Sequence, residues 1–382
     1  MKKILKIGLM LDPSIGYERG IARGVAKYSN LYGPWSFYSI PGKGRGPLPH
    51  WPNWDIDGVV ITDKYDVEYA LKKKIPCFSV LVREKVEGVP NIVPHDEEVG
   101  LLGANYFIER GFKHFSFCAE KGIKWVEQRY ESFRKRIEDA NFRVSKFYVN
   151  NDRIAISERL RLIANIRSLP KPLAVLAAND RYGRQIVDMC RQADIAVPEE
   201  VSVLGVDNDE FICGLSNPPL SSIIFNTEGA GYTAAMRLAQ MIEKEGDFYN
   251  DNLNIFVQPV GIFQRQSTSL FAVEDPIVAD AINFISRNDK RPIQVNDVSD
   301  HTGVSPKLLQ KKFKQILGRS VHDEIRRIRA DCIAKLLLEK SLTVSEIAYS
   351  MGYTCDNHMS RFFREVKGMT ITQYRKKYGG GF

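Results

Sequence analysis

The C-terminal third of the chain contains the same short pattern twice, about fifty residues apart. Residues 297–318 are DVSDHTGVSPKLLQKKFKQILG, and residues 346–368 are EIAYSMGYTCDNHMSRFFREVKG. Each copy is a short apolar stretch, a glycine, and a longer amphipathic stretch that ends at another glycine. A glycine between two helical patterns ends the first helix and permits a turn. The repeat therefore predicts two helix–turn–helix units in an all-helical domain.

In the second copy, the stretch after the first glycine has one apolar face and one polar face. Its apolar residues recur at i, i+3, i+4 and i+7, which is one side of a helix; they are Met359, Phe362, Phe363 and Val366. The opposite side is polar and basic, and comprises Asp356, Asn357, Ser360, Arg361 and Arg364. We expect the apolar side to pack against its own domain and the polar side to meet a partner.

The first copy predicts a helix with the same division. We expect Leu309, Phe313 and Ile316 to form its buried stripe. Ser305 is a favourable N-cap residue. The outward residues are Lys307, Gln310, Lys311 and Lys314. Such side chains can neutralise phosphates and pair with base edges in the major groove. The alternative is a helical bundle whose basic surface is only solvated.

Almost all of the positive charge lies in this helical part. The chain carries a formal net charge of +8, with 54 Lys and Arg against 46 Asp and Glu. From Asp275 onward there are 19 basic and 12 acidic residues, a balance of +7, which leaves +1 for residues 1–274. A basic domain joined to a neutral one indicates a polyanionic partner at one end only. With two helix–turn–helix units, that partner is expected to be double-stranded DNA.

The segment between the two copies, HDEIRRIRADCIAKLLLEK at 322–340, predicts one continuous linking helix. Nineteen residues in a helix span about 28 Å at 1.5 Å per residue. Successive major grooves on one face of B-DNA lie about 34 Å apart. One chain can therefore place its two helix–turn–helix units, at 296–317 and 345–367, in neighbouring grooves.

Residues 1–268 predict a different architecture, because strands and helices alternate there. The strand-like runs are ILKIGLML, WSFYSI, DGVVIT, PCFSVL, HFSFCA, LAVLAAND and VSVLGVD. Helical patterns lie between them, near 19–31, 98–110, 128–140, 181–193 and 229–244. This alternation is typical of a parallel α/β fold, and the number of units favours two lobes with a cleft between them. The strand pattern stops after IFQRQST, so we place a linker at 269–275 and the helical domain at 276–382.

Polar and aromatic residues follow the predicted strands of this first domain. They are Asp12, Tyr17, Arg19, His95, Asp96, Trp125, Arg129, Asn179, Asp180, Asp207, Asn208 and Asn226. In open α/β sheets, ligands bind beyond the carboxyl ends of the strands. Carboxylates, amides and guanidinium groups together satisfy hydroxyls, which both donate and accept. The set suits a neutral polyol such as a sugar, although each residue alone also fits a helix cap, a turn or the core.

Other classes of function have weaker motifs or none. The six cysteines have no disulfide or metal-ligand spacing, and we expect no metal and no cofactor. GKGRG at 42–46 lacks the phosphate-binding spacing, and no nucleophile elbow is present. The carboxylates leave a sugar-active enzyme open as an alternative. Asp12 interrupts any signal-peptide core, so we expect a cytoplasmic protein and not a periplasmic binding protein. A surface insertion is the simplest interpretation of PGKGRGPLPHWPNW at 41–54.

Residues 276–378 resemble the DNA-binding domain of AraC-type transcription regulators. The resemblance is carried by VSPKLLQKKFKQILGRSVHDEIRRIRADCIAKLLL and by VSEIAYSMGYTCDNHMSRFFREVKGMTITQYR. Thr370 and Ile371 stand where that family commonly has a proline, and Lys311 stands where it usually has arginine, so the bidentate fork to guanine is lost there. The resemblance implies groove contacts by Lys307, Gln310, Lys311, Asp356, Asn357, Ser360 and Arg361.

Residues 4–268 resemble the ligand-binding part of lactose-repressor-type regulators, which are related to periplasmic sugar-binding proteins. VPEEVSVLGVDNDE, NPPLSSIIFN, VGIFQRQST and AAND carry this resemblance. Those regulators place their helix–turn–helix at the N-terminus, whereas this chain begins at its first strand. The combination with a C-terminal AraC-type domain is similar to regulators of pentose genes, which implies D-xylose or a close pentose as ligand. The implied contacts are Tyr17, Arg19, Asp96, Trp125, Arg129, Asp180, Asp207 and Asn226.

These expectations combine into a sugar-responsive transcription regulator. We expect an activator that works as a homodimer on an operator with repeated half-sites, with RNA polymerase as a further partner. A sugar would close the two lobes, and closure would reposition the DNA-binding domains through the linker. A different monosaccharide and a sugar-active enzyme fused to a DNA-binding domain are the alternatives.

Overall fold

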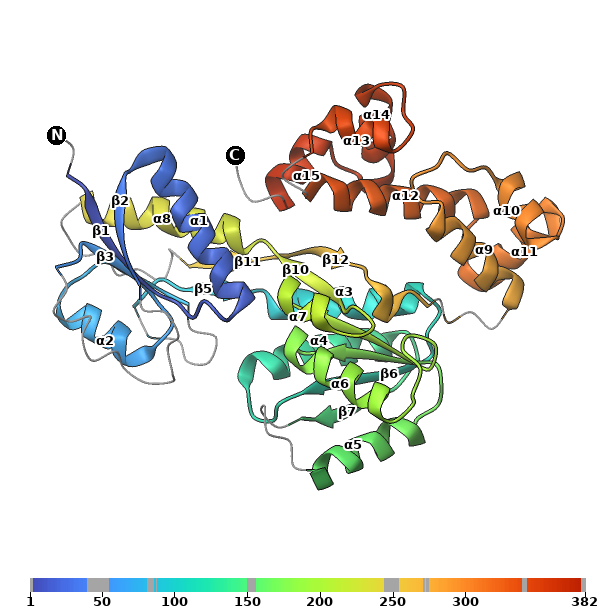
Figure 1. Cartoon of the computed structure of the whole chain (residues 1–382), viewed down its shortest axis with the longest axis horizontal. Helices are drawn as coiled ribbons and strands as arrows, with labels where there is room; N and C mark the ends of the chain where they lie inside the picture. The colour runs from blue at the N-terminus through green and yellow to red at the C-terminus, as the bar shows by residue number, and fades with distance from the viewer. Residues whose placement is uncertain are drawn as a thin grey trace.

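The computed structural model describes residues 3–39, 55–80, 86, 88–149, 156–243, 254–270, 272, 275–338 and 342–378. The insertion at 41–54, with its GKGRG segment, lies outside these residues. Figure 1 shows two α/β lobes and a separate helical domain, joined near the C-terminal lobe. This arrangement confirms the predicted fold class.

The N-terminal lobe is built on a four-stranded parallel sheet with strand order β2-β1-β3-β4. Its strands are β1 (Leu5–Met10), β2 (Trp35–Ser39), β3 (Gly58–Ile61) and β4 (Cys77–Ser79). Its helices are α1 (Gly16–Tyr32), α2 (Lys64–Lys72) and α8 (Thr227–Glu243). Helices α1 and α8 approach each other so closely that a Cβ atom on Gly24 would lie only 2.0 Å from the carbonyl oxygen of Glu228.

The C-terminal lobe is built on a six-stranded sheet with strand order β12-β10-β9-β8-β6-β7, in which only the β10–β12 pair is antiparallel. Its strands are β6 (His114–Ala119), β7 (Val144–Tyr148), β8 (Leu173–Ala177), β9 (Val201–Val206), β10 (Ser221–Phe225) and β12 (Pro259–Phe263). Its helices are α3 (Asp96–Glu109), α4 (Lys124–Asp139), α5 (Ile156–Ser168), α6 (Asp180–Gln192) and α7 (Glu210–Leu215), with a 3-10 turn, η3 (Gln266–Thr268). Every residue of β8 and β9 is buried, as expected for central strands covered on both faces.

The chain passes between the lobes at three places. Strand β5 (Ile92–Pro94) precedes α3, β10 precedes α8, and β11 (Ile255–Val257) precedes β12. Strands β5 and β11 pair in parallel and form a small two-stranded sheet between the lobes. Polar residues beside these crossings are therefore placed where the two lobes meet.

The helical domain has two parts joined by one long helix. Helices α9 (Pro276–Arg287), α10 (Val295–Thr302) and α11 (Pro306–Leu317) form the first part, and α13 (Val344–Ser350), α14 (Asp356–Lys367) and α15 (Ile371–Tyr378) form the second. Between them, α12 (Val321–Leu338) is continuous over 18 residues, about 27 Å. Each part has its own apolar core. The linking helix is therefore unbroken over the part of 322–340 that the structure describes.

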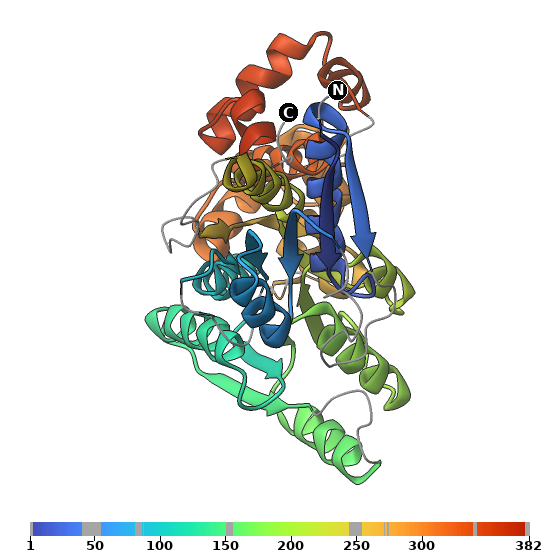
Figure 2. The ribbon, with the colours of Figure 1, turned by 90° about the vertical axis from the view of Figure 1, so that its left-hand side faces the viewer.

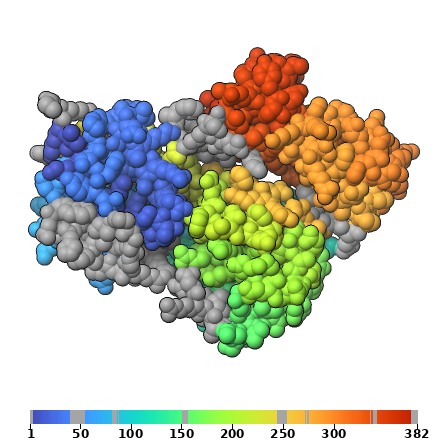
Figure 3. Space-filling view, viewed as in Figure 1, coloured from blue at the N-terminus to red at the C-terminus, as the bar shows by residue number. Residues whose placement is uncertain are grey.

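The helical domain lies at the end of the molecule opposite α5. Figures 1 and 2 show this from two directions, and Figure 3 shows its surface beside the C-terminal lobe. The predicted linker, 269–275, falls between η3 and α9, and Asp275 caps α9 by accepting hydrogen bonds from the backbone N–H groups of Ile277 and Val278. None of the described helices has the length and apolar character needed to cross a membrane.

Candidate functional site

A cavity of about 200 Å³ lies between the two lobes, beyond the carboxyl ends of the C-terminal strands. On the N-terminal side its wall is the turn at 14–16, directly before α1. The polar and aromatic residues of the other wall are Glu120, Trp125, Asn179, Asp180, Arg181, Tyr182, Asp207 and Asp209. Three of the eight predicted ligand contacts, Trp125, Asp180 and Asp207, therefore line this cavity.

Asp96 and Arg129 form a buried ion pair beside the cavity. Asp96 is the first residue of α3, and Arg129 lies in the second turn of α4. The Arg129 Nε donates to the Asp96 Oδ1 over 2.7 Å, and both side chains are less than a tenth exposed. Burial raises the pKa of Asp96 while Arg129 acts in the opposite direction. The Arg129 guanidinium also lies 4.5 Å from the centroid of the Trp125 ring, so the pair orients an aromatic wall of the cavity.

Asp180 organises the loop that follows β9. It begins α6, and its two carboxylate oxygens accept hydrogen bonds from the Ser222 hydroxyl and from the backbone N–H of Asp209. Burial and the nearby Asp207 raise the pKa of Asp180 well above its usual value. Asp180 therefore positions the loop 207–209 from the cavity wall, through the backbone of Asp209 and through Ser222.

The loop after β9 holds two residues in unusual backbone conformations. Asp207 has φ of 103° and Asn208 has φ of 50°. Both values lie in the left-handed region, which residues other than glycine rarely adopt. Asp207 lines the cavity and is only partly exposed. Burial, opposed by Arg129 and reinforced by Asp96 and Asp209, raises the pKa of Asp207 to about 7. Asp207 thus lies among other carboxylates, of which Asp96 pairs with Arg129 and Asp209 pairs with Arg19.

Two polar atoms at the cleft are buried without a hydrogen-bond partner in the described part of the chain. They are the hydroxyl of Tyr17 and the side-chain oxygen of Asn208. The Tyr17 ring packs edge-to-face on Phe225, with 5.7 Å between ring centroids. Burial raises the pKa of Tyr17 well above its usual value, so its hydroxyl stays protonated and can donate. Unsatisfied buried groups are rare in folded proteins, and these two are suited to a hydroxylated ligand.

One ion pair bridges the two lobes at the cavity. The Arg19 Nη2 of α1 donates to the Asp209 Oδ2 at the start of α7, over 2.9 Å. Arg19 also donates to the carbonyl of Pro13, which holds the turn before α1. Arg19 is therefore placed at the cleft as expected, but as a bridge between the lobes, and it does not line the cavity.

Asn226 serves a different element. Its side-chain oxygen accepts from the backbone N–H of Gly229 over 3.0 Å, at the start of α8, and its backbone N–H donates to Gln258. It lies at the crossing from β10 to α8 and is not part of the cavity wall. Asn179, which does line the cavity, caps α6 by accepting from the backbone N–H of Tyr182. Both residues act as helix caps in this structure.

The described residues contain no group of three or more His, Cys, Asp or Glu side chains arranged to hold a metal ion. All six cysteines are free thiols. The chemistry of the cleft is therefore that of hydrogen bonds, ion pairs and an aromatic face.

The two predicted recognition helices are α11 and α14. Ser305 caps α11 by accepting from the backbone N–H of Leu308. The helices before them end at equivalent glycines, Gly303 with φ of 68° and Gly352 with φ of 75°, where only glycine adopts the turn without strain. The helices themselves end at Gly318 and Gly368, each with φ of 70°. The two units are therefore structurally equivalent, as the repeat predicts.

The polar faces of these helices are open to solvent. Lys307, Gln310, Lys311, Asn357 and Arg361 are exposed, and Asp356 and Ser360 are partly buried. Arg361 has a side chain 84% exposed and pairs only with Glu365 one turn away, at 3.2 Å. The Gln310 side-chain oxygen instead accepts from the backbone N–H of Val321, at the start of α12. Within α11, Gln310 thus has a structural contact as well as its exposed position.

One residue of the predicted stripes is placed wrongly. Leu309, Phe313, Met359 and Phe363 are fully buried, but Ile316 is 43% exposed. Leu317, the next residue, packs against the core of the first part in its place. The helix ends at Gly318, and neighbouring positions in its last turn cannot be separated by an apolar period alone.

Comparisons with known proteins agree with both halves of this description. Residues 104–268 match a periplasmic binding protein-like domain, and residues 298–377 match a helix-turn-helix domain. The xylose operon regulatory protein of Escherichia coli (strain K12) is 26% identical over 382 residues, covering 97% of this chain and 96% of that protein. A putative AraC-like transcription regulator of Streptomyces lividans is 34% identical over 107 residues, 28% of this chain and 35% of that protein.

The structure of a xylose-binding transcription activator, xylR, has the same fold, with a TM-score of 0.62, 24% identity and coverage of 98% of both chains. The chain therefore combines a periplasmic binding protein-like domain with a helix-turn-helix domain of the AraC type. The full-length relatives of this regulator are named as transcription regulators and not as enzymes, which removes the sugar-active enzyme that the sequence left open.

The regulator's cleft also contains residues that the sequence did not single out. Glu120 follows β6 directly, and its carboxylate accepts from the Tyr182 hydroxyl over 2.8 Å. Asp209 follows β9 and joins the lobes. Both residues lie just beyond the end of a strand, the same position from which the other polar residues of the cleft were predicted. Tyr182 lies inside α6, and no sequence pattern distinguished it from a core aromatic residue.

Proposed function

We propose that this regulator binds a monosaccharide, a pentose such as D-xylose, between its two lobes and thereby controls its affinity for operator DNA. The observation that carries the proposal is the cavity of about 200 Å³, with its carboxylates, its aromatic wall and two buried polar atoms beside it that lack partners. Typical pockets for drug-sized ligands begin at about 300 Å³, so this space suits a single sugar ring.

The chemistry of the walls fits a neutral polyol. Asp207 and Glu120 can accept hydrogen bonds from sugar hydroxyls, and the Tyr17 hydroxyl can donate one. Trp125 offers an apolar face to the C–H groups of a ring. The full-length relative from Escherichia coli is named for the xylose operon, which supports a pentose as the ligand.

On the DNA side, α11 and α14 are proposed to enter two successive major grooves of one operator half-site. The polar residues of these two faces would contact bases and phosphates, and these are Lys307, Gln310, Lys311, Asp356, Asn357, Ser360 and Arg361. A homodimer would then cover a repeated operator. We further propose that the regulator activates transcription in the cytoplasm through contact with RNA polymerase.

A sugar can change DNA binding only if it binds the lobes more tightly in one arrangement than in another. The Arg19–Asp209 bridge joins the two surfaces that are proposed to move relative to each other. A sugar that contacts both the turn at 14–16 and the loop at 207–209 would favour the closed arrangement of the lobes.

The test is a thermal-shift screen of the full chain against pentoses and hexoses, followed by operator titrations with and without the best sugar. At one hundred times its dissociation constant, a ligand stabilises the folded protein by about 2.7 kcal/mol. D-xylose is expected to raise the melting temperature and to change operator affinity. A shift with a hexose only would change the proposed ligand, and no shift with any sugar would contradict the proposal. Asp207→Ala should weaken sugar binding and leave operator affinity without sugar unchanged.

A further inference from the structure

Helix α3 connects the two functional parts of the chain physically. Its first residue, Asp96, belongs to the ion pair beside the cleft, and its last residue, Glu109, lies against the helical domain. The helix has 14 residues and spans about 21 Å. Gly100 packs its backbone on α4, since a Cβ there would lie 2.2 Å from the carbonyl oxygen of Arg129. The helix therefore cannot shift without moving the residues of the cleft.

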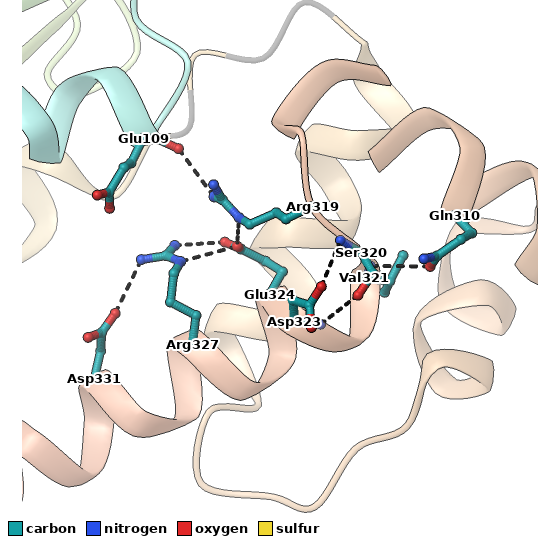
Figure 4. Close-up of polar contacts among 9 residues, drawn as sticks. All are labelled: Glu109, Gln310, Arg319, Ser320, Val321, Asp323, Glu324, Arg327 and Asp331. Carbon is teal, nitrogen blue, oxygen red and sulfur yellow. Dashed lines mark hydrogen bonds and ion pairs between the residues drawn. The ribbon is translucent and has the colours of Figure 1, made fainter. Parts of the chain in front are cut away.

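The C-terminal end of α3 receives its positive partner from the other domain. Its last turn contains no basic residue, although the carbonyl groups at a helix C-terminus carry partial negative charge. Arg319, in the turn between α11 and α12, donates from its Nη2 to the carbonyl oxygen of Glu109 over 3.3 Å. Figure 4 shows this side chain reaching from the helical domain to the end of α3.

Arg319 is held in place by a buried carboxylate of its own domain. Glu324, in the first turn of α12, has a fully buried side chain and pairs with both Arg319 and Arg327. Burial alone would raise the pKa of Glu324, but Arg327 and Arg319 hold the pKa below its usual value. Arg327 also pairs with Asp331 at 3.2 Å. These four residues, the α12 charge cluster, join the turn after α11 to α12 (Figure 4).

Beyond these charges, the contact between the domains is loosely packed, with both polar and apolar residues along it. A cavity of about 780 Å³ lies there, lined on one side by Tyr106, Glu109 and Arg110 and on the other by Arg327 and Asp331. The Glu109 carboxylate acts with Glu324 and Asp331 to raise the pKa of Arg327 against the effect of burial. Domains of one chain generally move relative to each other unless their interface is large and hydrophobic. The loose packing around this cavity is compatible with such motion.

The sensor side of the interface is firmly anchored. Arg110 stacks on Tyr106, with 3.6 Å between the guanidinium carbon and the ring centroid, and donates to Gln264 over 2.8 Å. The Tyr106 hydroxyl forms a hydrogen bond with the Thr268 hydroxyl, directly before the linker. The end of α3 is thus tied to the last residues of the sensor domain.

We propose that the C-terminal end of α3 is the docking site through which the sensor domain positions the DNA-binding domain, with the α12 charge cluster as its counterpart. Because α12 carries both helix–turn–helix units, moving this contact moves both recognition helices. The inference deepens the proposed function, on which its regulatory part rests. Glu109 is a positioning residue in this scheme, since it touches neither sugar nor DNA.

The test reverses one exposed charge on the sensor side. Glu109→Arg places a cation against Arg319 and Arg327 and should release the helical domain, whereas Glu109→Gln should have an intermediate effect. The control is Glu68→Arg, the same charge change on an exposed position of α2 at the far end of the N-terminal lobe (Figure 1). Operator affinity is measured with and without D-xylose, sugar affinity is measured without DNA, and small-angle X-ray scattering reports the separation of the domains.

In allosteric proteins, binding of one ligand commonly changes the affinity for the other by about 5- to 150-fold. We expect a sugar effect on operator affinity in this range for the wild type and for Glu68→Arg, and a ratio near one for Glu109→Arg. Sugar affinity in Glu109→Arg should stay unchanged, and its radius of gyration should increase. A Glu109→Arg variant with the wild-type sugar effect and unchanged scattering would overturn the inference. A wild type without a sugar effect would contradict the proposed function, while the scattering would still decide whether α3 is the docking site.

Discussion

Asp207 combines features that indicate a functional role and not a purely structural one. Its backbone is in the left-handed region, which costs free energy for a residue with a side chain. Its carboxylate lines the cavity together with those of Glu120, Asp180 and Asp209, and Arg129 acts on it as the opposing charge. Such a group is costly to ionise in the free protein. A ligand that donates hydrogen bonds to it would reduce that cost.

Sugar affinity should therefore depend on pH. With a pKa of about 7, Asp207 is protonated below neutral pH in the free protein. A sugar hydroxyl that donates to the carboxylate favours the ionised form, so binding releases a proton and affinity increases with pH. The dissociation constant should rise about tenfold for each pH unit below 7 and level off above it. Calorimetric titrations at several pH values measure this slope. Asp207→Asn should remove it, and a slope that persists in the variant would assign the proton to another group.

Arg129 should be essential to the stability of the sensor domain. Its removal would leave Asp96 charged and buried without a partner, which costs about 3–5 kcal/mol. We expect Arg129→Ala to lower the urea midpoint of the sensor transition strongly. The matched control is Arg134→Ala on the same helix, whose pairs with Glu131 and Glu138 are partly exposed and worth about 1 kcal/mol or less. Equal effects of the two substitutions would contradict a buried pair.

At the scale of single elements, α14 carries the most direct prediction about base reading. Arg361 is almost fully exposed on its polar face and can exchange the Glu365 contact for a base. Arg361→Ala should cost about 1–3 kcal/mol in operator binding and little in binding to scrambled DNA. Arg184→Ala is the control, because Arg184 has the same i, i+4 pairing, with Asp188, on the sensor domain. An equal loss on both DNA sequences would make Arg361 a phosphate contact.

Helix α12 fixes the distance between the two recognition helices, and this can be tested on the DNA alone. Within one half-site, α11 and α14 are proposed to contact two DNA segments. Inserting half a helical turn of DNA between these segments turns the second groove away from the protein, so affinity should fall to that of one segment alone. Inserting a full turn restores the facing but adds about 34 Å, which an unbroken helix of 18 residues cannot reach. Recovery of affinity on the second DNA, measured by fluorescence anisotropy, would show a flexible connection.

Elements were easier to predict from the sequence than contacts. The helices expected near 19–31, 98–110 and 181–193 are present as α1, α3 and α6, and α1 and α6 have a regular apolar period. Short or partly exposed elements, such as β5, β11 and α7, gave no such period. The Arg19–Asp209 bridge joins residues 190 positions apart, and the role of Asp180 depends on Ser222 and on the backbone of Asp209. Such pairings arise from the tertiary fold, which local patterns do not encode. The groove contacts of α11 and α14 stay predictions.

At the scale of the whole molecule, charge and function are divided between the domains. The last 108 residues carry +7 of the net charge of +8. The cleft, by contrast, is proposed to hold a neutral ligand. The two binding reactions of the chain should therefore respond differently to salt.

Operator affinity should fall steeply with salt, while sugar affinity should not change. Each phosphate neutralised by the protein contributes about −0.9 to the slope of log affinity against log salt concentration. Titrations between about 50 and 200 mM salt measure both slopes. Lys307→Ala should reduce the DNA slope by roughly one phosphate contact. A salt-dependent sugar affinity would indicate a charged ligand in place of a sugar.

The two recognition helices are equivalent in backbone but not in side chains, and α12 joins them in a fixed order. On the proposed groove contacts, we expect the chain to bind its half-site in one orientation, since in the other Lys307 and Lys311 of α11 would exchange places with Asn357 and Arg361 of α14. The bound DNA sequence is consequently asymmetric and has a direction along the duplex. Inverting it would move the sensor domain from one flank of the site to the other, so the strand on which the sequence is written would decide which neighbouring gene the protein faces.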